Sequence, residues 1–204
     1  MGMRRAEFPY LPDLLVLALR WLVLVVFITV QALSGTPSVS FLGVVAAAAS
    51  LNLILSILAV ANTRLPAHRV IGVVLDVLIS GGFFYTSGGL SGALAWAGVL
   101  AILSGALYYE WRGALLSTLL VTLLEGAVTL RMIGTDSLAA YLLPGSILLA
   151  IHLAAMLVLG LLSRRVMRLL RQRYRSLLAL REETERKARL KERQRLEIFF
   201  KMVE

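Results

Sequence analysis

Six apolar stretches, each near the length that a membrane-spanning helix needs, follow one another along the first 163 residues. A bilayer requires about 20 mostly apolar residues per helical crossing. The chain is 59% hydrophobic and 16% charged, which is more apolar than a water-soluble domain of this size needs. The sequence therefore predicts an all-α, six-span polytopic bundle in residues 13–163, preceded by a lead-in over residues 1–12. The predicted spans are Leu14–Leu33, Phe41–Ala61, Val70–Tyr85, Ala93–Tyr109, Ala114–Leu130 and Leu138–Leu162.

The connections between the spans are short and differ in charge. They hold between 4 and 8 residues, so neighbouring spans should run antiparallel. The first and third connections, 34–40 and 86–92, carry no Lys or Arg, and the fifth has Arg131 beside Asp136. The arginines that mark the opposite side are Arg4, Arg5, Arg64, Arg69 and Arg112. By the positive-inside rule both termini are cytoplasmic, as an even number of spans requires, and we expect a bacterial cytoplasmic (inner) membrane.

The segment 164–204 differs sharply from the rest of the chain. It contains 14 of the 21 Lys and Arg residues and 6 of the 12 Asp and Glu residues, with neither Gly nor Pro. Strong helix formers dominate it, so the sixth span should continue as one helix, roughly 60 Å beyond Ser163 if unbroken. A basic segment beside a bilayer indicates the cytoplasmic side and contact with anionic lipid. Nothing in it resembles a base-reading module, so no nucleic-acid partner is expected.

The tail carries a thin apolar stripe at steps of three and four residues. Its members are Leu170, Tyr174, Leu177, Thr184, Ala188, Leu196, Phe199 or Phe200, and Val203. This spacing predicts a weak coiled coil and a parallel homodimer through 164–204, with a single solvated helix as the alternative. The apolar residues of the last stretch, FFKMVE, indicate the entry to a cytoplasmic output domain that is absent from this chain.

Four ionisable side chains fall inside the predicted spans, where such groups are costly. Helical rise places Arg20 and Asp76 at similar depths, roughly 10 to 12 Å from the cytoplasmic edge, and predicts a structural ion pair. Glu125 and His152 lie deeper, at roughly 18 to 20 Å. They form a candidate intramembrane ligand or proton site, with a structural hydrogen-bonded pair as the alternative. One His and one Glu are too few ligands for a metal site, and no cofactor is expected.

Glycine and proline mark two further features. Gly88, Gly89 and Gly92 lie close together between the third and fourth spans, which predicts a tight outer turn, with a ligand mouth as a second interpretation. Pro144 followed by Gly145 should kink the sixth span near its outer end, because proline removes a backbone hydrogen bond. That kink is a candidate hinge, with plain packing as the alternative.

The stretch 83–116 resembles the N-terminal multi-span membrane regions of bacterial sensor histidine kinases and related signalling proteins. In those regions a third span ends in a Ser-Gly-Gly turn, here Ser87–Gly89, and an aromatic-Arg-Gly step opens the fifth, here Trp111–Gly113. The tail is similar to the helix that joins such regions to their output domains. The chain departs from a whole kinase, because it has no ATP-binding domain and both histidines, His68 and His152, lie in the membrane part.

These features favour a membrane sensor and transmitter of a two-component system. It would detect a membrane-proximal signal and relay it through the last helix to an output domain such as a histidine kinase. No catalytic motif is found in this chain, so it would be the non-catalytic part. The alternatives are a small transporter or membrane subunit of a transport complex, which would use Glu125 and His152, and an anchor that holds a partner at the membrane.

Overall fold

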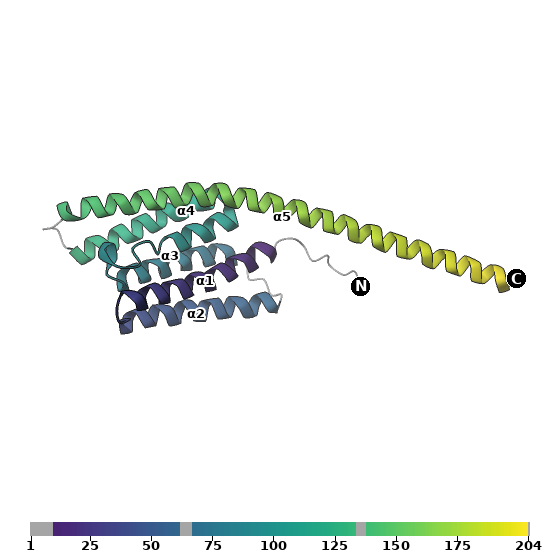
Figure 1. The fold of residues 1–204 in the computed structure, drawn as a ribbon, viewed down its shortest axis with the longest axis horizontal. Helices are drawn as coiled ribbons and strands as arrows, with labels where there is room; N and C mark the ends of the chain where they lie inside the picture. The colour runs from purple at the N-terminus through teal and green to yellow at the C-terminus, as the bar shows by residue number, and fades with distance from the viewer. Residues whose placement is uncertain (1–9, 62–66, 134–137, 204) are drawn as a thin grey trace. The chain divides into compact units, whose positions relative to one another are not determined.

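The regular secondary structure is helical throughout the described part of the chain, which confirms the all-α prediction. The computed structural model describes residues 10–61, 67–133 and 138–203, without the side chains of 10–12, 133, 138, 171 and 192–203. The elements, shown in Figure 1, are α1 (Tyr10–Ser34), α2 (Val39–Val60), α3 (His68–Thr86), the 3-10 turn η1 (Gly89–Ser91), α4 (Val99–Ile133) and α5 (Leu138–Val203). Several predictions concern positions or side chains outside the described residues: Arg4, Arg5, Arg64, Asp136, Leu196, Phe199, Phe200, Met202 and Val203.

Five helices are long and apolar enough to cross a membrane, judged by length and composition. They are α1, α2, α3, α4 and α5. Many of their large side chains point away from the protein interior: Leu22, Leu53 and Leu123 are 59%, 55% and 62% exposed. Leucines spread over several helices in this way would be costly in water, whereas lipid tails solvate them well. The outer surface is therefore consistent with association with a lipid bilayer.

Helix α4 accounts for two of the six predicted spans, because the chain turns back on itself at Glu110. This residue has φ 56° and ψ −136° and interrupts the helix. In a straight helix Gly105 and Gly113 would lie about 12 Å apart. Instead, a Cβ atom placed on Gly105 would lie 2.7 Å from the carbonyl oxygen of Gly113. One placed on Gly98 would lie 2.8 Å from Glu125 Oε1. The two parts of α4 thus form a tight antiparallel hairpin.

The first part of this hairpin begins later than the sequence predicted. Residues 92–98 form consecutive turns, and α4 begins at Val99 instead of Ala93. The backbone hydrogen bonds of this segment span three residues, as in the bond of 3.0 Å from Ala97 N–H to the carbonyl of Leu94. The indole N–H of Trp96 also bonds the Ala93 carbonyl at 3.1 Å. Local bonds of this kind compete with a regular helix, and apolarity alone could not reveal them.

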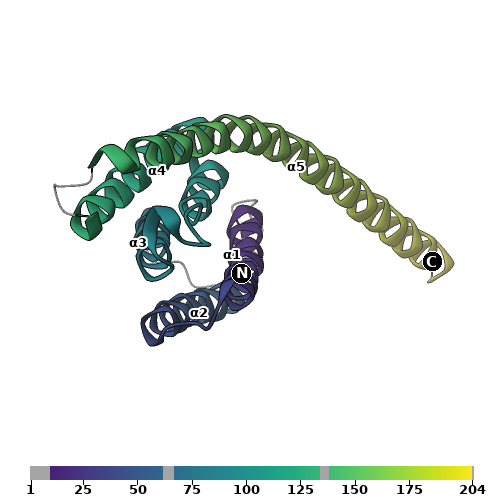
Figure 2. The same ribbon diagram turned by 60° about the vertical axis from the view of Figure 1, so that its left-hand side comes forward.

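Aromatic side chains join α1, α2 and α3 to the turns before α4. Phe27 meets Phe83 edge to face, with ring centroids 4.9 Å apart, and meets Trp96 at 5.1 Å. Phe41 lies 5.5 Å from Phe83. Phe27, Phe41 and Phe83 are fully buried or nearly so. Figure 2 shows α1, α2 and α3 side by side, and each contacts the next in chain order.

The chain divides into two compact units, Met1–Arg164 and Arg165–Glu204. Helix α5 contributes residues to both. The second unit consists of charged helix, with exposed ion pairs at helical spacing between Arg181 and Glu185 (3.3 Å) and between Glu183 and Lys187 (2.8 Å). Such pairs contribute only a few tenths of a kcal/mol each.

The close contact inside α4 predicts that Gly113 tolerates no larger side chain. An added Cβ would overlap the Gly105 carbonyl oxygen, which is backbone and cannot move aside. We expect Gly113→Ala to destabilise the folded protein by about 1–3 kcal/mol or to prevent folding. The measurement is the thermal unfolding midpoint in nanodiscs. Gly43→Ala on α2 is the matched control, because nothing lies within 4 Å of its added Cβ. Equal midpoints for the two variants would contradict the hairpin.

Candidate functional site

A cavity of about 250 Å³ lies between the second part of α4 and the beginning of α5. Its polar end holds Glu125 and His152, which the sequence singled out, and its other end reaches Leu130 and Tyr141. The remaining lining residues are Leu90, Thr122, Gly126, Thr129, Leu142, Gly145, Leu148 and Leu149. Apolar side chains thus form most of the wall, with Thr122, Glu125 and His152 at one end and Thr129 and Tyr141 towards the other, a composition found in small-molecule sites.

Glu125 and His152 come together although 27 residues separate them in the sequence. The Nε2 atom of His152 lies 3.5 Å from Glu125 Oε2. Glu125 is 3% exposed and His152 is 1% exposed. No hydrogen bond of good geometry joins the two groups within the described residues. The predicted depth match therefore corresponds to spatial proximity, and the two groups lie within ion-pair distance of each other.

The polar end of the cavity gathers side-chain atoms that lack a protein partner. Seven buried side-chain oxygen and nitrogen atoms have no aligned hydrogen-bond partner among the described residues, and four of them belong to residues that line this cavity. Those four are Thr122 Oγ1, both carboxylate oxygens of Glu125 and His152 Nε2, and the backbone of Gly98 lies within reach of the Glu125 carboxylate. Buried polar atoms are nearly always hydrogen-bonded in folded proteins. Their concentration at one place indicates partners supplied from outside the chain, such as water, a proton or a ligand.

Gly98 allows Glu125 and His152 to approach each other. A Cβ atom on Gly98 would lie 2.8 Å from both Glu125 Oε1 and His152 Nε2, and it would overlap the side chain of Val121. Gly98 lies in the irregular turns before Val99, and its backbone packs directly against both polar side chains. Sequence reasoning did not connect Gly98 with this site, and it missed Thr122 and Tyr141 as lining residues.

One of the two predicted hinge residues, Gly145, belongs to the same cavity wall. Helix α5 runs through Pro144, and Gly145 lines the cavity with nothing within 4 Å of an added Cβ. The next residue, Ser146, donates a hydrogen bond of 2.8 Å to the Leu143 carbonyl. A missing backbone hydrogen bond and an open glycine thus occur together where the helix faces the cavity. Whether this place acts as a hinge stays a prediction.

The predicted outer turn also contributes to the cavity. Gly88 and Gly89 have φ values of 107° and 65°, which favour glycine. Gly92 packs against the Ser87 carbonyl, where a Cβ would overlap it. Between these glycines, Leu90 of η1 lines the cavity wall. The two interpretations of this stretch, a tight turn and part of a ligand mouth, are therefore compatible.

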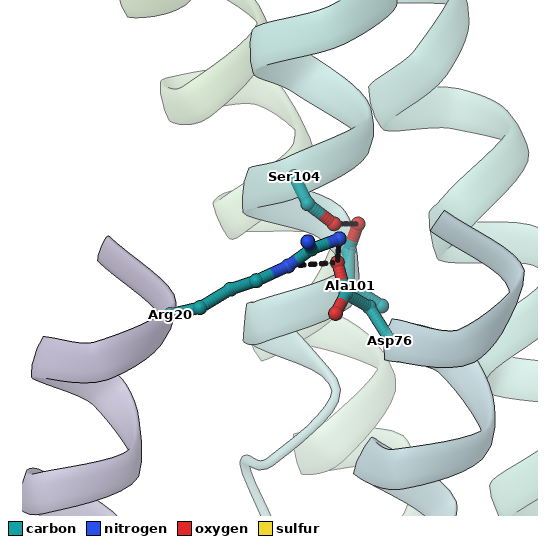
Figure 3. A network of polar contacts seen from close by, with 4 residues as sticks. All are labelled: Arg20, Asp76, Ala101 and Ser104. Atoms are coloured by element: carbon teal, nitrogen blue, oxygen red, sulfur yellow. Dashed lines mark hydrogen bonds and ion pairs between the residues drawn. The ribbon is translucent and has the colours of Figure 1, made fainter. Parts of the chain in front are cut away.

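Arg20 and Asp76 form a buried ion pair away from the cavity, as Figure 3 shows. The guanidinium donates two hydrogen bonds to Asp76 Oδ2, of 2.7 Å from Nη2 and 3.1 Å from Nε. Both residues are nearly fully buried, and Ser104 of α4 lies beside them. Gly72 gives the guanidinium room, since a Cβ there would lie 2.9 Å from Nη2. The pair links α1 to α3, which agrees in geometry with the predicted structural role.

A second ionic cluster joins the beginnings of α1 and α3, and sequence reasoning missed it. Arg69 donates hydrogen bonds of 3.0 and 3.2 Å to the two carboxylate oxygens of Asp13. His68 Nε2 lies 3.5 Å from the same carboxylate, and the Arg69 guanidinium lies 5.6 Å from the centroid of the Tyr108 ring. Asp13 directly precedes the first apolar stretch, so its charge could have suggested a partner near the end of another span.

Comparisons with known proteins add no family to this picture. A scan against protein-family models found no match, and searches of curated proteins and of solved structures also found none. The resemblance to sensor-kinase membrane regions therefore rests on the residues alone. No group of three or more His, Cys, Asp or Glu side chains that could hold a metal ion occurs within the described part of the chain.

The burial of the Arg20–Asp76 pair predicts a large effect when one partner is removed. Arg20→Met leaves the Asp76 carboxylate buried without its cation, which we expect to cost roughly 3–5 kcal/mol. The double variant Arg20→Met/Asp76→Leu removes both charges and should recover most of the loss. The measurement is the unfolding midpoint in nanodiscs, with Arg181→Met, which breaks an exposed pair, as the control. A single variant as stable as this control would rule out a structural role.

Proposed function

We propose that this protein is a membrane sensor and transmitter, in which the cavity between α4 and α5 receives the signal and α5 relays it to a cytoplasmic output. The observation that carries the proposal is the double role of α5. This helix supplies Tyr141, Leu142, Gly145, Leu148, Leu149 and His152 to the cavity wall, and the same helix extends through the charged segment to Val203. Occupation of the cavity would act directly on the element that carries the output segment.

The packing of α5 around Gly160, where its apolar stretch ends, supports such a relay. A Cβ atom on Gly160 would lie 2.7 Å from the indole ring of Trp111, next to the turn at Glu110. Ala155, Met156 and Leu159 pack against Ile102, Ala106 and Ala114 of the hairpin. A helix that packs through such apolar contacts can shift between two arrangements, and a ligand that prefers one arrangement biases the equilibrium.

We further propose six membrane crossings with both termini in the cytoplasm of a bacterial cell. The hairpin in α4 supports this count, since its two parts run antiparallel, the first lies within the fourth predicted span and the second includes the fifth. The charge of the connections supports the orientation, because Arg69 and Arg112 then lie on the cytoplasmic side and the Gly88–Gly92 turn on the other.

This topology predicts which single cysteines an impermeant thiol reagent reaches. The chain has no Cys, so each introduced thiol is unique. In intact spheroplasts we expect Ser91→Cys to be labelled and Arg112→Cys to be labelled only after permeabilisation. If α4 crossed the membrane once as a straight helix, residue 112 would lie within the bilayer and would stay unlabelled in both conditions.

A transporter is the second candidate, because a buried acid and a histidine beside a cavity also suit proton or substrate translocation. Transport requires access to the site from each side in turn. Beyond Glu125 and His152, in the direction of the Glu110 turn, α4 and α5 are joined by the apolar cluster of Ile102, Ala106 and Ala114 with Ala155 and Met156. This packing closes the inner side in this structure, so transport would require the cluster to open, whereas a relay through α5 requires no such opening. An anchor without a ligand does not account for the cavity.

For the output we propose a parallel homodimer through 164–204 that contacts a cytoplasmic domain, such as a histidine kinase. Several leucines of the second unit support a helical partner, since Leu169, Leu177, Leu180 and Leu190 are each about 60% exposed. Apolar side chains at such positions gain stability when a second helix covers them.

The proposal predicts that a change in the cavity alters pairing of the tail. Single cysteines placed in turn from Leu169 to Leu190 should give symmetric disulfide crosslinks that recur every three to four residues. The combined change Glu125→Gln and His152→Ala should redistribute crosslink intensity among these positions by about twofold or more, since it alters the polar contacts of α5.

Thr29→Val is the control, because it removes an exposed polar group of α1 outside the cavity, and it should preserve the pattern. A folded protein without crosslinks would exclude the dimer. A pattern that Glu125→Gln with His152→Ala leaves unchanged would exclude signalling through this site.

A further inference from the structure

We infer that the cavity binds a small ligand made of a primary ammonium group and a short apolar body, an inference that rests on the proposed sensing role of this cavity. The chemistry of the four unpartnered atoms carries the inference. Each of them can accept a hydrogen bond, and none belongs to a cationic Lys or Arg side chain. A ligand that satisfies them must therefore bring donors to this end of the cavity.

Geometry matches the donors of an ammonium group to three acceptors. Glu125 Oε2 and His152 Nε2 are 3.5 Å apart, so one nitrogen atom can lie within hydrogen-bond distance of both. Thr122 precedes Glu125 by three positions on α4, which places both side chains on the same helix face. A primary ammonium has three N–H donors and no acceptor, which fits the Glu125 carboxylate, the Thr122 hydroxyl and His152 Nε2 with its proton on Nδ1.

The charge of the Glu125 carboxylate also favours an ammonium head group over an anion or an alcohol. A carboxylate that is 3% exposed among apolar residues needs either a proton or a cationic partner. Among the described residues no Lys or Arg lines the cavity to serve as that partner, and His152 with its proton on Nδ1 alone is neutral. An anionic ligand would face the carboxylate, and an alcohol would offer a single donor to three acceptors. The ammonium ion supplies both the missing charge and the missing donors.

The remaining walls define the body of the ligand. Leu90, Leu130, Leu142, Leu148 and Leu149 surround the space beyond the polar end. A volume of about 250 Å³ lies just below the usual range of small-molecule sites, so the ligand is small. Tyr141 and Thr129, near the far end, complete the lining. A short alkyl or aryl chain attached to the ammonium carbon fits these walls.

The test compares head groups on one apolar body, using the whole chain in lipid nanodiscs. The probes are hexylammonium, hexan-1-ol, hexanoate and hexyltrimethylammonium, and empty nanodiscs provide the baseline for partitioning into lipid. We expect saturable binding of hexylammonium at least about tenfold tighter than that of hexanol, as charge-assisted hydrogen bonds imply. Hexyltrimethylammonium, which keeps the charge but has no N–H donor, should lose most of this advantage, and hexanoate should not bind.

Variants link the preference to the site. Glu125→Gln preserves the shape of the side chain and should abolish the preference for hexylammonium over hexanol, whereas Glu183→Gln, which makes the same change in an exposed ion pair outside the cavity, should keep it. Equal binding of hexanol and hexylammonium to the unchanged protein would overturn the inference, and so would equal binding of the trimethyl compound. These comparisons need no variant, so they hold even if Glu125→Gln fails to fold.

The binding result is independent of the tail, so the two proposals can fail separately. Selective binding of hexylammonium with an unchanged crosslinking pattern would retain the ligand class and reject the relay. Crosslinks that respond to Glu125→Gln with His152→Ala, in a protein that binds none of the four compounds, would retain the relay and reject the ligand class.

Discussion

The site depends on three glycines, Gly98, Gly105 and Gly113, because the backbone at each of them lies too close to its neighbours to admit a Cβ atom. Gly105 and Gly113 belong to the α4 hairpin, and Gly98 belongs to the turns that precede it. Gly105 and Gly113 meet where any Cβ would overlap a carbonyl group, and this contact lets the chain reverse at Glu110. The reversal then sets Gly98 beneath Glu125 and His152. Without hydrophobic attraction between helices in lipid, small residues that permit such proximity become the main source of packing energy. The cavity exists because this hairpin leaves one side of Glu125 facing α5.

The two buried polar sites respond to the same apolar surroundings in different ways. Arg20 and Asp76 satisfy each other through two hydrogen bonds to one carboxylate oxygen, in a space that Gly72 leaves open. Glu125 and His152 lie within ion-pair distance, but no other side chain in the described part of the chain makes an aligned hydrogen bond to the Glu125 carboxylate or to His152 Nε2. A buried ion pair that is complete holds helices in place. A buried acid that lacks donors, at the end of a cavity, is suited to a partner from outside the chain.

Much of the fold could be predicted from hydropathy, since apolar length identifies helices and charge marks their ends. Rise per residue was enough to predict that Arg20 lies level with Asp76 and Glu125 level with His152. The turn at Glu110 could not be predicted in detail, because composition does not reveal which non-glycine residue adopts a left-handed conformation, here with φ 56°. The irregular start before Val99 was missed for a similar reason, as Ala93–Gly98 is as apolar as a helix. The cavity depends on which faces of α4 and α5 meet, and this information emerges only when the helices pack.

The proposed relay requires a coupling between the cavity and the segment that follows it on α5. Pulsed electron paramagnetic resonance measures that coupling directly, with one spin label at position 177 of the chain in nanodiscs, before and after saturation with hexylammonium. We expect a measurable distribution of distances between the two labels of the dimer. This distribution should shift when hexylammonium binds, and it should stay fixed in the Glu125→Gln variant. If hexylammonium occupied the cavity and the distance distribution stayed unchanged, the coupling between the cavity and the tail would be excluded.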